Sequence, residues 1–443
     1  MRRRTAPRRS PKVQPLGPVQ TYQVDSLTHE AKGVARFSGK VTFIDGALPG
    51  ETVEAQVVKA GRRFDEANLT RILQSSPHRI SPACVHFAKC GGCSFQHLAA
   101  EQQLETKKQW LKGQLRNVAD NAELELLSDA PFAYRRRARI SIQSQKEGFQ
   151  MGFRGKASKN IIQIDQCLVL TQPLQLVYAA LKKSLENNAL TIKIGHIELL
   201  EDTQGSSVLF RLTAPIAESL QAEWQAWAKD HDVVLYWQQP TESKASVAPT
   251  SLRRYELDGL TFQYHPQDFI QVNQTLNQQM VAQAMDWLAP NDEDVILDLF
   301  CGVGNFSLPL AKRAKQVLGI EVQESMVEAG RKNAQLNQLD KVAFLAADLT
   351  QPVSAGLSKM GVTKVLLDPP RTGALEFLDS IIKIKPEQIL YVSCNASTLA
   401  RDAEYLVAKG YQVSRVSLMD MFPQTSHVEA MMLLQKRSKL KGK

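Results

Sequence analysis

The sequence lacks the features that would place the chain in a membrane or outside the cell. No apolar run approaches the roughly 18 residues of a membrane-spanning helix. The arginine-rich start, "MRRRTAPRRSPK", is not followed by the apolar segment of a secretory or twin-arginine signal. Six cysteines are few for a disulfide framework in a chain of 443 residues. We therefore expect a cytoplasmic protein without membrane contact.

Positive charge is concentrated at the two ends of the chain. The net charge is +9, but the first twelve residues carry six positive charges and the last eight carry five, which leaves about −2 for the rest. Two disordered basic tails are predicted, the first over 1–14. Such tails suit phosphate binding, because neutralised phosphates release counterions. Tails that only favour solubility are an equally good interpretation.

The chain also lacks internal repeats, and its pattern predicts a multidomain α/β protein with three parts. Alternating residues such as those of "ETVEAQVV" predict a small β-barrel over 15–73, for which an OB-like design is one option among many. Mixed strands and helices predict an α+β central domain over 74–262, in which part of 95–125 is free to pack on the domain that follows. Alternating apolar strands and helices over 263–443 predict a doubly wound, Rossmann-like sheet.

A cysteine cluster lies early in the central domain. In "CVHFAKCGGCSFQH", Cys84, Cys90 and Cys93 follow a C-x5-C-x2-C spacing, and Cys167 is the available fourth ligand. Four thiolates suit either zinc or an iron–sulfur cluster, and spacing cannot decide between them. The C-x3-C-x2-C spacing of radical enzymes is absent. We therefore expect a centre that shapes structure or RNA.

A glycine turn predicts a nucleoside site in the third domain. "VILDLFCGVGNFSLPLA" resembles a dinucleotide fingerprint, but Ser307 replaces the third glycine, which weakens a phosphate-binding interpretation. Asp298, Glu321 and Asp348 each end a predicted strand. Taken singly they suit helix caps or turns. Together they favour S-adenosylmethionine, which is cationic at sulfur and carries no phosphate.

Two further strand ends carry candidate chemistry. "LLDPPRTG" lacks the aromatic residue that amino-group methyltransferases often have after D-P-P, and Arg371 stands there instead, which indicates another acceptor. In "LYVSCNAST", Cys394 follows a buried strand and could serve packing, metal binding or nucleophilic attack. Its place in a cofactor-binding sheet favours attack. Cys301 keeps the packing interpretation.

These motifs, together with "DFIQVN", "YVSCNASTLARD" and "QTSHVEAM", resemble those of the bacterial RNA (uracil-5-)-methyltransferases. The resemblance covers nearly the whole chain. The predicted barrel looks like a TRAM domain, an RNA-binding module. A TRAM domain joined to the cysteine cluster most resembles the branch that methylates 23S ribosomal RNA, whereas the transfer RNA branch lacks both features.

The resemblance also implies residue roles. It implies a [4Fe-4S] cluster held by Cys84, Cys90, Cys93 and Cys167. It implies S-adenosylmethionine contacts from Gln271, Phe300, Asn305, Glu321, Asp348 and Asp368, although position 348 is Asn in some relatives. Cys394 matches the family nucleophile and Glu429 the general base, with His427 as a weaker rival.

The implied reaction explains the need for a thiol. Uracil C5 is too poorly nucleophilic to attack a methylsulfonium, but addition of a thiolate to C6 creates an enolate with electron density at C5. After methyl transfer, a base removes the C5 proton and the thiol leaves. A paired uracil cannot reach the thiol, so the target must be looped or flipped out.

The partner is expected to be 23S ribosomal RNA, bound by a monomer. The arginines of "YRRRARISI" are candidate phosphate contacts, as is the arginine after D-P-P: Arg135, Arg136, Arg137, Arg139 and Arg371. A plain surface strand is the alternative for the first four. Another 23S uridine, a transfer RNA, or a non-catalytic RNA-binding or assembly role remain alternative functions.

Overall fold

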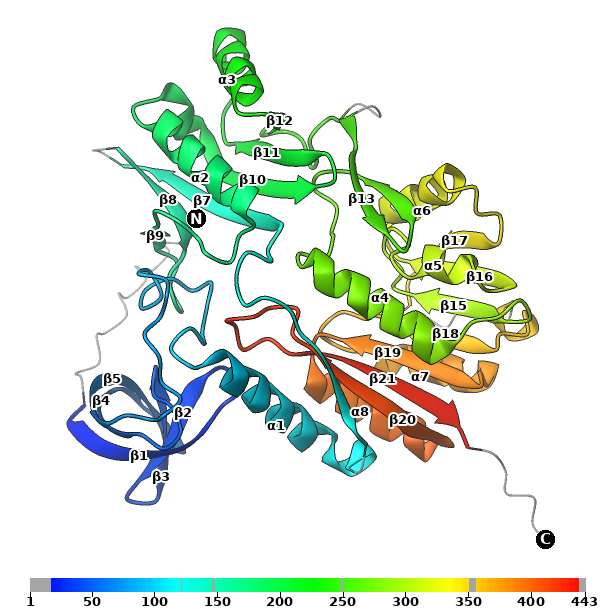
Figure 1. The fold of residues 1–443 in the computed structure, drawn as a ribbon, viewed down its shortest axis with the longest axis horizontal. Coiled ribbons are helices and arrows are strands. Elements are labelled where there is room, and N and C mark those ends of the chain that lie inside the picture. The colour runs from blue at the N-terminus through cyan, green and yellow to red at the C-terminus, as the bar shows by residue number, and fades with distance from the viewer. Residues whose placement is uncertain (1–16, 121, 146–147, 248–250, 350–355, 438–443) are drawn as a thin grey trace, which may run out of the picture. The chain divides into compact units, whose positions relative to one another are not determined.

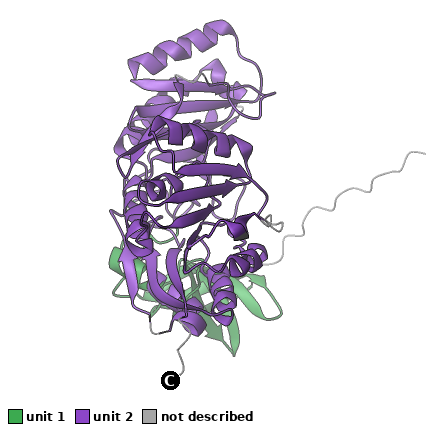
Figure 2. Ribbon diagram, turned by 90° about the vertical axis from the view of Figure 1, so that its right-hand side faces the viewer, with its two compact units in different colours: residues 1–83, 94–106 green, residues 84–93, 107–443 purple. Residues whose placement is uncertain are grey.

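The computed structural model describes residues 17–120, 122–145, 148–247, 251–349 and 356–437. The predicted tail over 1–14 and residues 438–443 of the second basic segment lie outside this part of the chain. Two compact units are formed, one by residues 1–83 and 94–106 and one by residues 84–93 and 107–443 (Figure 2). Within the described residues, no helix is long and apolar enough to cross a membrane.

The first unit contains the predicted barrel, which is confirmed. Five strands close it in the order β1-β2-β3-β5-β4. Their bounds are β1 Val19–Leu27, β2 Lys32–Phe37, β3 Lys40–Asp45, β4 Thr52–Ala60 and β5 Phe64–Gln74. In β4, Val53, Ala55 and Val57 point into the barrel core, as the alternation in the sequence predicts.

The central part of the second unit is a six-stranded sheet in the order β12-β11-β10-β7-β8-β9. The strands are β7 Arg137–Ser144, β8 Phe149–Arg154, β9 Ile161–Gln163, β10 Ile194–Asp202, β11 Gly205–Leu212 and β12 Val233–Gln238. Helices α2 (Gln172–Leu185) and α3 (Glu218–Asp230) cover one face (Figure 1). Ile140, Ile197 and Phe210 share a core with these helices. The alternate residues therefore face away from them.

An eight-stranded sheet forms the rest of the second unit, in the order β17-β16-β15-β18-β19-β21-β20-β6. The strands are β6 Leu124–Leu127, β15 Val295–Leu299, β16 Gln316–Glu321, β17 Val342–Ala346, β18 Lys364–Leu367, β19 Gln388–Ser393, β20 Tyr411–Met419 and β21 Glu429–Lys436. The five strands from β17 to β19 run parallel, and β21 is antiparallel to β19. The predicted doubly wound domain is confirmed.

Helices accompany the sheet on both sides (Figure 1). They are α4 Gln274–Leu288, α5 Ser307–Ala311, α6 Glu324–Leu336, α7 Leu375–Ile384 and α8 Ala396–Ala408, with short 3-10 turns at Ala189–Lys193 and Leu357–Lys359. Both faces of the central strands are buried, so these strands have continuous apolar runs and the sequence pattern finds them easily.

Strand β6 was not predicted from the sequence. It precedes the six-stranded sheet in the chain, yet it pairs in parallel with β20, where Leu124 lies opposite Val416. Helix α1 (Ala100–Ala119) precedes it and places Leu111 and Leu115 in the core beside the eight-stranded sheet. All four residues of β6 are half-buried, so no alternation marks the strand in the sequence.

A buried ion pair joins the six-stranded sheet to the ribbon formed by β13 (Arg253–Leu257) and β14 (Leu260–Tyr264). Arg253 Nε donates to Asp202 Oδ2 at 2.9 Å, and the Tyr264 hydroxyl donates to the same oxygen at 2.7 Å. The side chains of Arg253 and Asp202 are 2% and 0% exposed. The pair therefore fixes the orientation of the ribbon before it leads into "DFIQVN".

We predict that Asp202→Asn lowers the free energy of unfolding by about 3–5 kcal/mol, because it leaves a buried guanidinium without a counter-charge. Urea denaturation followed by circular dichroism measures the change. Glu328→Gln, which removes only exposed partners of Arg331 and Lys332, should change it by less than about 0.5 kcal/mol. Equal stability of Asp202→Asn and wild type would contradict the prediction.

Candidate active site

The carboxyl ends of four parallel strands gather polar side chains at one edge of the eight-stranded sheet. Asp298 lies in β15, Glu321 ends β16, Asp368 follows β18 and Cys394 follows β19. The Asp368 N–H continues the pairing of β18 by donating to Leu299 O at 3.3 Å. Open α/β sheets bind their ligands at this edge.

Glu429 reaches the same edge by a different route. It begins β21, which is antiparallel to β19 and pairs Ser393 with Ala430. The next position in this register brings Glu429 opposite Cys394. The carboxylate and the thiol, 35 residues apart in sequence, are therefore neighbours because of strand pairing.

The glycine turn after β15 leaves space for a ligand. Phe300 adopts a positive φ of 64°, and its N–H donates to Ile320 O at 2.8 Å. Gly302 has a φ of 56°, and a Cβ at this position would meet no atom within 4 Å. The Gly302 N–H donates to Glu321 Oε2 at 3.3 Å, which fixes the turn against the end of β16.

Asp298 is fully buried beneath this turn. The Ser307 hydroxyl donates to its Oδ2, while its Oδ1 has no hydrogen-bond partner among the described residues. Burial raises the pKa of Asp298 to about 7, and the neighbouring Asp368 and Glu321 contribute to that rise. An orphaned, buried carboxylate oxygen of this kind suits a cationic or hydrogen-bond-donating ligand.

Other predicted cofactor residues lie in loops and beyond a strand end. The backbone carbonyl of Gln271 accepts from Arg136 Nε at 2.9 Å, so this bond does not involve the Gln271 side-chain amide. The amides of Asn305 and Asn277 bond reciprocally at 3.0 and 3.1 Å. Asp348 is exposed just beyond β17. Asp348 therefore shares the sheet edge with Asp298 and Glu321, because β15, β16 and β17 are parallel neighbours.

Helix α8 holds the D-P-P-R loop. Asn395 Nδ2 donates to Arg371 O at 3.0 Å, and Asp402 Oδ2 accepts from Ala374 N–H at 2.8 Å. Between them Gly373 has a φ of 80°, and a Cβ there would lie 2.6 Å from Asp402 Oδ2. The motif "CNASTLARD" therefore supplies the thiol and also the side chains that hold the facing loop.

Burial and nearby carboxyl groups set the acid–base environment of Cys394. Its side chain is exposed, but partial burial raises the pKa of the thiol, as do Glu429 and Asp368, whereas Arg371 lowers it. Burial and Asp368 raise the pKa of Glu429 to about 8, and burial raises the pKa of Asp368 to about 7. Small changes of pH near neutrality therefore change the protonation state of Glu429.

The loop that leads into Glu429 is anchored by residues that the sequence did not reveal. Lys107 Nζ donates to Asp420 Oδ1 at 2.5 Å and to Phe422 O at 3.2 Å. The Tyr134 hydroxyl donates to Pro423 O at 3.0 Å. More than 280 residues separate these partners in sequence, so no local pattern could have indicated them.

His427, the weaker candidate for the base, lies on this loop. Its side chain is exposed and its ring meets the edge of Phe422 at 5.6 Å between centroids. Burial lowers the pKa of His427, and Arg371, Lys107 and Arg135 lower it further. The histidine therefore stands among cations, while the carboxyl groups gather around Cys394.

The predicted metal ligands lie in a tightly wrapped loop. Cys90 forms an isolated antiparallel β-bridge with Gly155, and the Gly91 N–H donates to Arg154 O at 2.9 Å. A Cβ on Gly91 would lie 2.9 Å from that carbonyl, so glycine permits the close approach. The Gly92 N–H donates to Cys90 Sγ at 3.4 Å, a bond that favours a thiolate.

The four thiols of this region interact electrostatically. Burial raises the pKa of Cys90, and Cys84 raises it further. Burial raises the pKa of Cys167 to about 12, with Cys93 and Cys90 contributing. Within the described ranges, however, no three His, Cys, Asp or Glu side chains lie close enough together to hold a single ion. Thiol donors of this kind suit zinc or an iron–sulfur cluster.

The five candidate RNA-binding arginines have different environments. Arg136 is 2% exposed and lies over the Tyr255 ring, so its guanidinium cannot reach an RNA phosphate. Arg135 Nε donates to Arg137 O at 2.9 Å. Arg139 and Arg371 are exposed. The arginine-rich motif is thus divided between the interior and the surface.

Comparisons with known proteins match this architecture along the chain. The tRNA (uracil-5-)-methyltransferase family model matches residues 99–437, and the TRAM domain model matches residues 16–70. The chain belongs to the tRNA (uracil-5-)-methyltransferase family.

Individual relatives are similar over almost their whole length. A protein of Marinomonas sp. (strain MWYL1), named 23S rRNA (uracil(1939)-C(5))-methyltransferase RlmD, is 66% identical, with 99% of this chain and 100% of the relative covered. A protein of the same name from Pseudomonas putida is 41% identical over 96% of each chain. The structure of Pyrococcus abyssi tRNA (uracil-54, C5)-methyltransferase in complex with S-adenosyl-L-homocysteine has a TM-score of 0.75, 26% identity, and coverage of 94% of this chain and 100% of that one.

The buried carboxyl group of Asp298 predicts how the free energy of unfolding changes with pH. Because the folded-state pKa of Asp298 is raised from 3.8 to about 7, its contribution to stability is present below the unfolded value and is lost as pH rises through the folded value. The wild-type free energy of unfolding should therefore fall relative to that of Asp298→Asn by about 1.4 kcal/mol per pH unit across this interval.

Urea denaturation at several pH values measures this difference. Asp292→Asn, which changes an exposed carboxyl, is the matched control and should follow wild type at each pH. Parallel pH profiles of wild type and Asp298→Asn would show that Asp298 is ionised throughout, contrary to the prediction.

Proposed function

We propose that this chain transfers a methyl group from S-adenosyl-L-methionine to C5 of a uridine in 23S ribosomal RNA, the uridine that corresponds to uracil 1939 in the names of its relatives. The observation that carries the proposal is the pairing of β19 with β21, which sets Cys394 opposite Glu429 at the edge that holds the glycine turn. Membership of the family and the names of the relatives support the reaction and the RNA.

Cys394 is proposed as the nucleophile. Its thiolate adds to C6 of the uracil, and the C5–C6 double bond becomes an enolate whose electron density lies at C5. The Arg371 guanidinium, which lowers the pKa of the thiol, favours the thiolate. The exposed position of Cys394 lets a flipped base approach it.

The methyl donor supplies an electrophilic methyl group, which C5 accepts. The residues proposed to hold it are Gln271, Phe300, Asn305, Glu321, Asp348 and Asp368. The buried Oδ1 of Asp298 and the open space at Gly302 support a ligand at this turn. Because Asp368 raises the pKa of both Cys394 and Glu429, we assign it to positioning rather than to the base.

Glu429 is proposed as the general base. After methylation, C5 carries a proton and a methyl group, and removal of that proton drives elimination of Cys394 and restores the C5–C6 double bond. The pKa of Glu429, about 8, lies close to the pH at which a base works best. Lys107 and Tyr134 hold the loop that leads to it.

The covalent intermediate can be trapped. A 23S fragment in which 5-fluorouracil replaces the target uracil has no C5 proton to lose, so wild type and S-adenosylmethionine should give an adduct that survives denaturing electrophoresis. Cys394→Ala should give none. On normal RNA, Glu429→Gln should lower turnover by at least about a hundredfold, because proton transfer to a positioned base contributes about that much, while Cys394–RNA adduct accumulates.

Cys301→Ala serves as the matched control, because Cys301 is buried in the glycine turn and is assigned no chemistry. Absence of the Cys394-dependent adduct with wild type would sink the proposed chemistry. Full cellular function of the Cys394→Ala and Glu429→Gln variants would favour the non-catalytic alternative. Methylation of a transfer RNA or another 23S uridine would retain the chemistry and change the substrate.

We also propose that Cys84, Cys90, Cys93 and Cys167 hold a [4Fe-4S] cluster. The thiols contribute to one another's pKa, and glycine lets the loop wrap closely, which supports a shared centre. Such a cluster would tie the segment at 84–93 to the six-stranded sheet through Gly155 and Cys167. We assign it a structural role.

Protein purified without oxygen should contain iron and acid-labile sulfide in equal amounts. Cys167→Ala should lose most of the iron, because three thiolates do not close the site, whereas Cys301→Ala should keep it. Metal analysis measures both. A colourless wild-type protein that contains zinc would contradict the cluster.

A further inference from the structure

The face of the six-stranded sheet opposite α2 and α3 carries a group of basic side chains outside the candidate active site. Arg139 on β7 lies opposite Glu198 on β10, and His196 on β10 lies opposite Arg211 on β11. On the other side, Ser141 of β7 pairs with Gly152 of β8, so Arg154 shares this face with Arg139. We call Arg139, Arg154, His196 and Arg211 the arginine face.

The members of the arginine face lie near one another in space. Burial lowers the pKa of His196, and Arg139, Arg211 and Arg154 lower it further, so all three guanidinium groups act on the same ring. Arg139 and Arg154 are exposed, and Arg211 is half-buried. The face is therefore accessible to a ligand from solvent.

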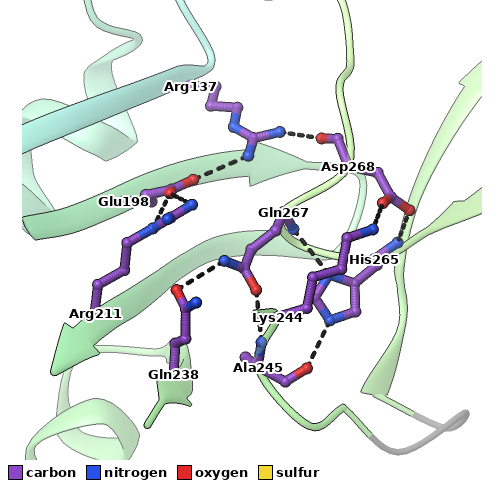
Figure 3. A network of polar contacts seen from close by, with 9 residues as sticks. All are labelled: Arg137, Glu198, Arg211, Gln238, Lys244, Ala245, His265, Gln267 and Asp268. Carbon is purple, nitrogen blue, oxygen red and sulfur yellow. Dashed lines mark hydrogen bonds and ion pairs between the residues drawn. The ribbon is translucent and has the colours of Figure 1, made fainter. Parts of the chain in front are cut away.

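Positive charge on this face is only partly neutralised. Glu198 accepts from Arg137 Nη2 at 2.9 Å and from Arg211 Nε at 2.5 Å, so one carboxylate serves two arginines (Figure 3). Among the described residues, no carboxylate pairs with Arg139 or Arg154. Guanidinium groups that have no carboxylate partner repel one another in such a cluster, and a bound anion would relieve this repulsion.

The strands that carry the arginine face contact the cysteine loop and the segment that precedes Gln271. On β8, Arg154 O accepts from Gly91 N–H of the cysteine loop. On β7 beside Arg139, Arg137 donates to Asp268 O (Figure 3). Asp268 precedes Phe269, which is 64% exposed, and is close in sequence to Gln271 of the proposed cofactor site. A chain of anions on this face would run from the cysteine loop toward the site of methyl transfer.

We propose that the arginine face binds the phosphodiester backbone of the substrate RNA and so leads the target uridine toward Cys394. The occupant is RNA because a planar guanidinium bonds phosphate oxygens in a bidentate way and the proposed reaction requires a polynucleotide. Gln143 and Gln150 pair on the same face, beyond the Ser141–Gly152 pair, and add amides that bond sugars and phosphates. The inference rests on the proposed function and names the part of the surface that its RNA follows.

The test is the salt dependence of RNA binding. For the full-length protein and a 23S fragment with the target uridine, log Kd is plotted against log salt concentration. Arg139→Gln with Arg154→Gln should weaken binding about tenfold or more. It should also reduce the slope by about 1 for each phosphate that the variant no longer neutralises. At saturating RNA, kcat should stay near that of wild type while KM rises.

A matched control removes the same charge from the opposite side. Lys183→Gln with Lys229→Gln changes two exposed lysines on α2 and α3 and should leave the slope unchanged. Arg139→Lys should retain the slope, since the charge remains. Arg139→Gln alone provides a variant in which the described structure loses no hydrogen bond or ion pair.

An unchanged slope in the Arg139 and Arg154 variants, with native circular dichroism and iron content, overturns the proposal. So does an equal loss of slope in the lysine control, which would indicate a general charge effect. Wild type could bind the fragment with a salt dependence that these arginines produce, yet fail to methylate it. That result would support the arginine face and contradict the proposed function. The two ideas therefore have separate outcomes.

Discussion

The site depends on one electrostatic constraint: buried and half-buried carboxyl groups meet at one sheet edge. Asp298 and Asp368 come from neighbouring parallel strands and Glu429 from the antiparallel strand beside Cys394. Burial raises the pKa of each carboxyl into the range from about 7 to about 8. Their ionised forms are unfavourable until a cation or donor arrives. The edge is thus poised for a cationic ligand and for proton transfer near neutral pH.

Two loops complete this edge, and both are held by side chains that take no part in the proposed reaction. Asp402 and Asn395 bond the D-P-P-R loop, which carries Arg371. The buried Lys107–Asp420 pair holds the loop before Glu429. Because a buried ion pair tolerates few alternative arrangements, it favours one loop position even where its net contribution to stability is small. Precision at the thiol therefore depends on the side chains that α1 and α8 supply.

The arginine-rich motif shows how one short run can supply several parts of a structure. Arg136 turns inward over Tyr255, Arg137 bonds Glu198 and the Asp268 carbonyl, and Arg139 remains exposed. Neighbouring side chains of β7 point to opposite faces of the sheet. Arg136 and Arg137, which lie nearest to the β13–β14 ribbon and Asp268, contact them. Arg139 is left for a partner, with Arg154 of the neighbouring strand β8 on the same face.

Local patterns predicted the barrel, the parallel strands and the strand-end positions of Asp298, Glu321 and Cys394, because periodicity and turn chemistry act over a few residues. They also predicted the four cysteines as one group, and family motifs implied Glu429. Tertiary structure alone decided that β6 joins the far sheet, that Lys107 pairs with Asp420, that Arg136 is interior, and that Arg154 and Arg211 join Arg139. Alternation shows which residues of a strand share a face, but strand order and long-range packing determine what lies beside them.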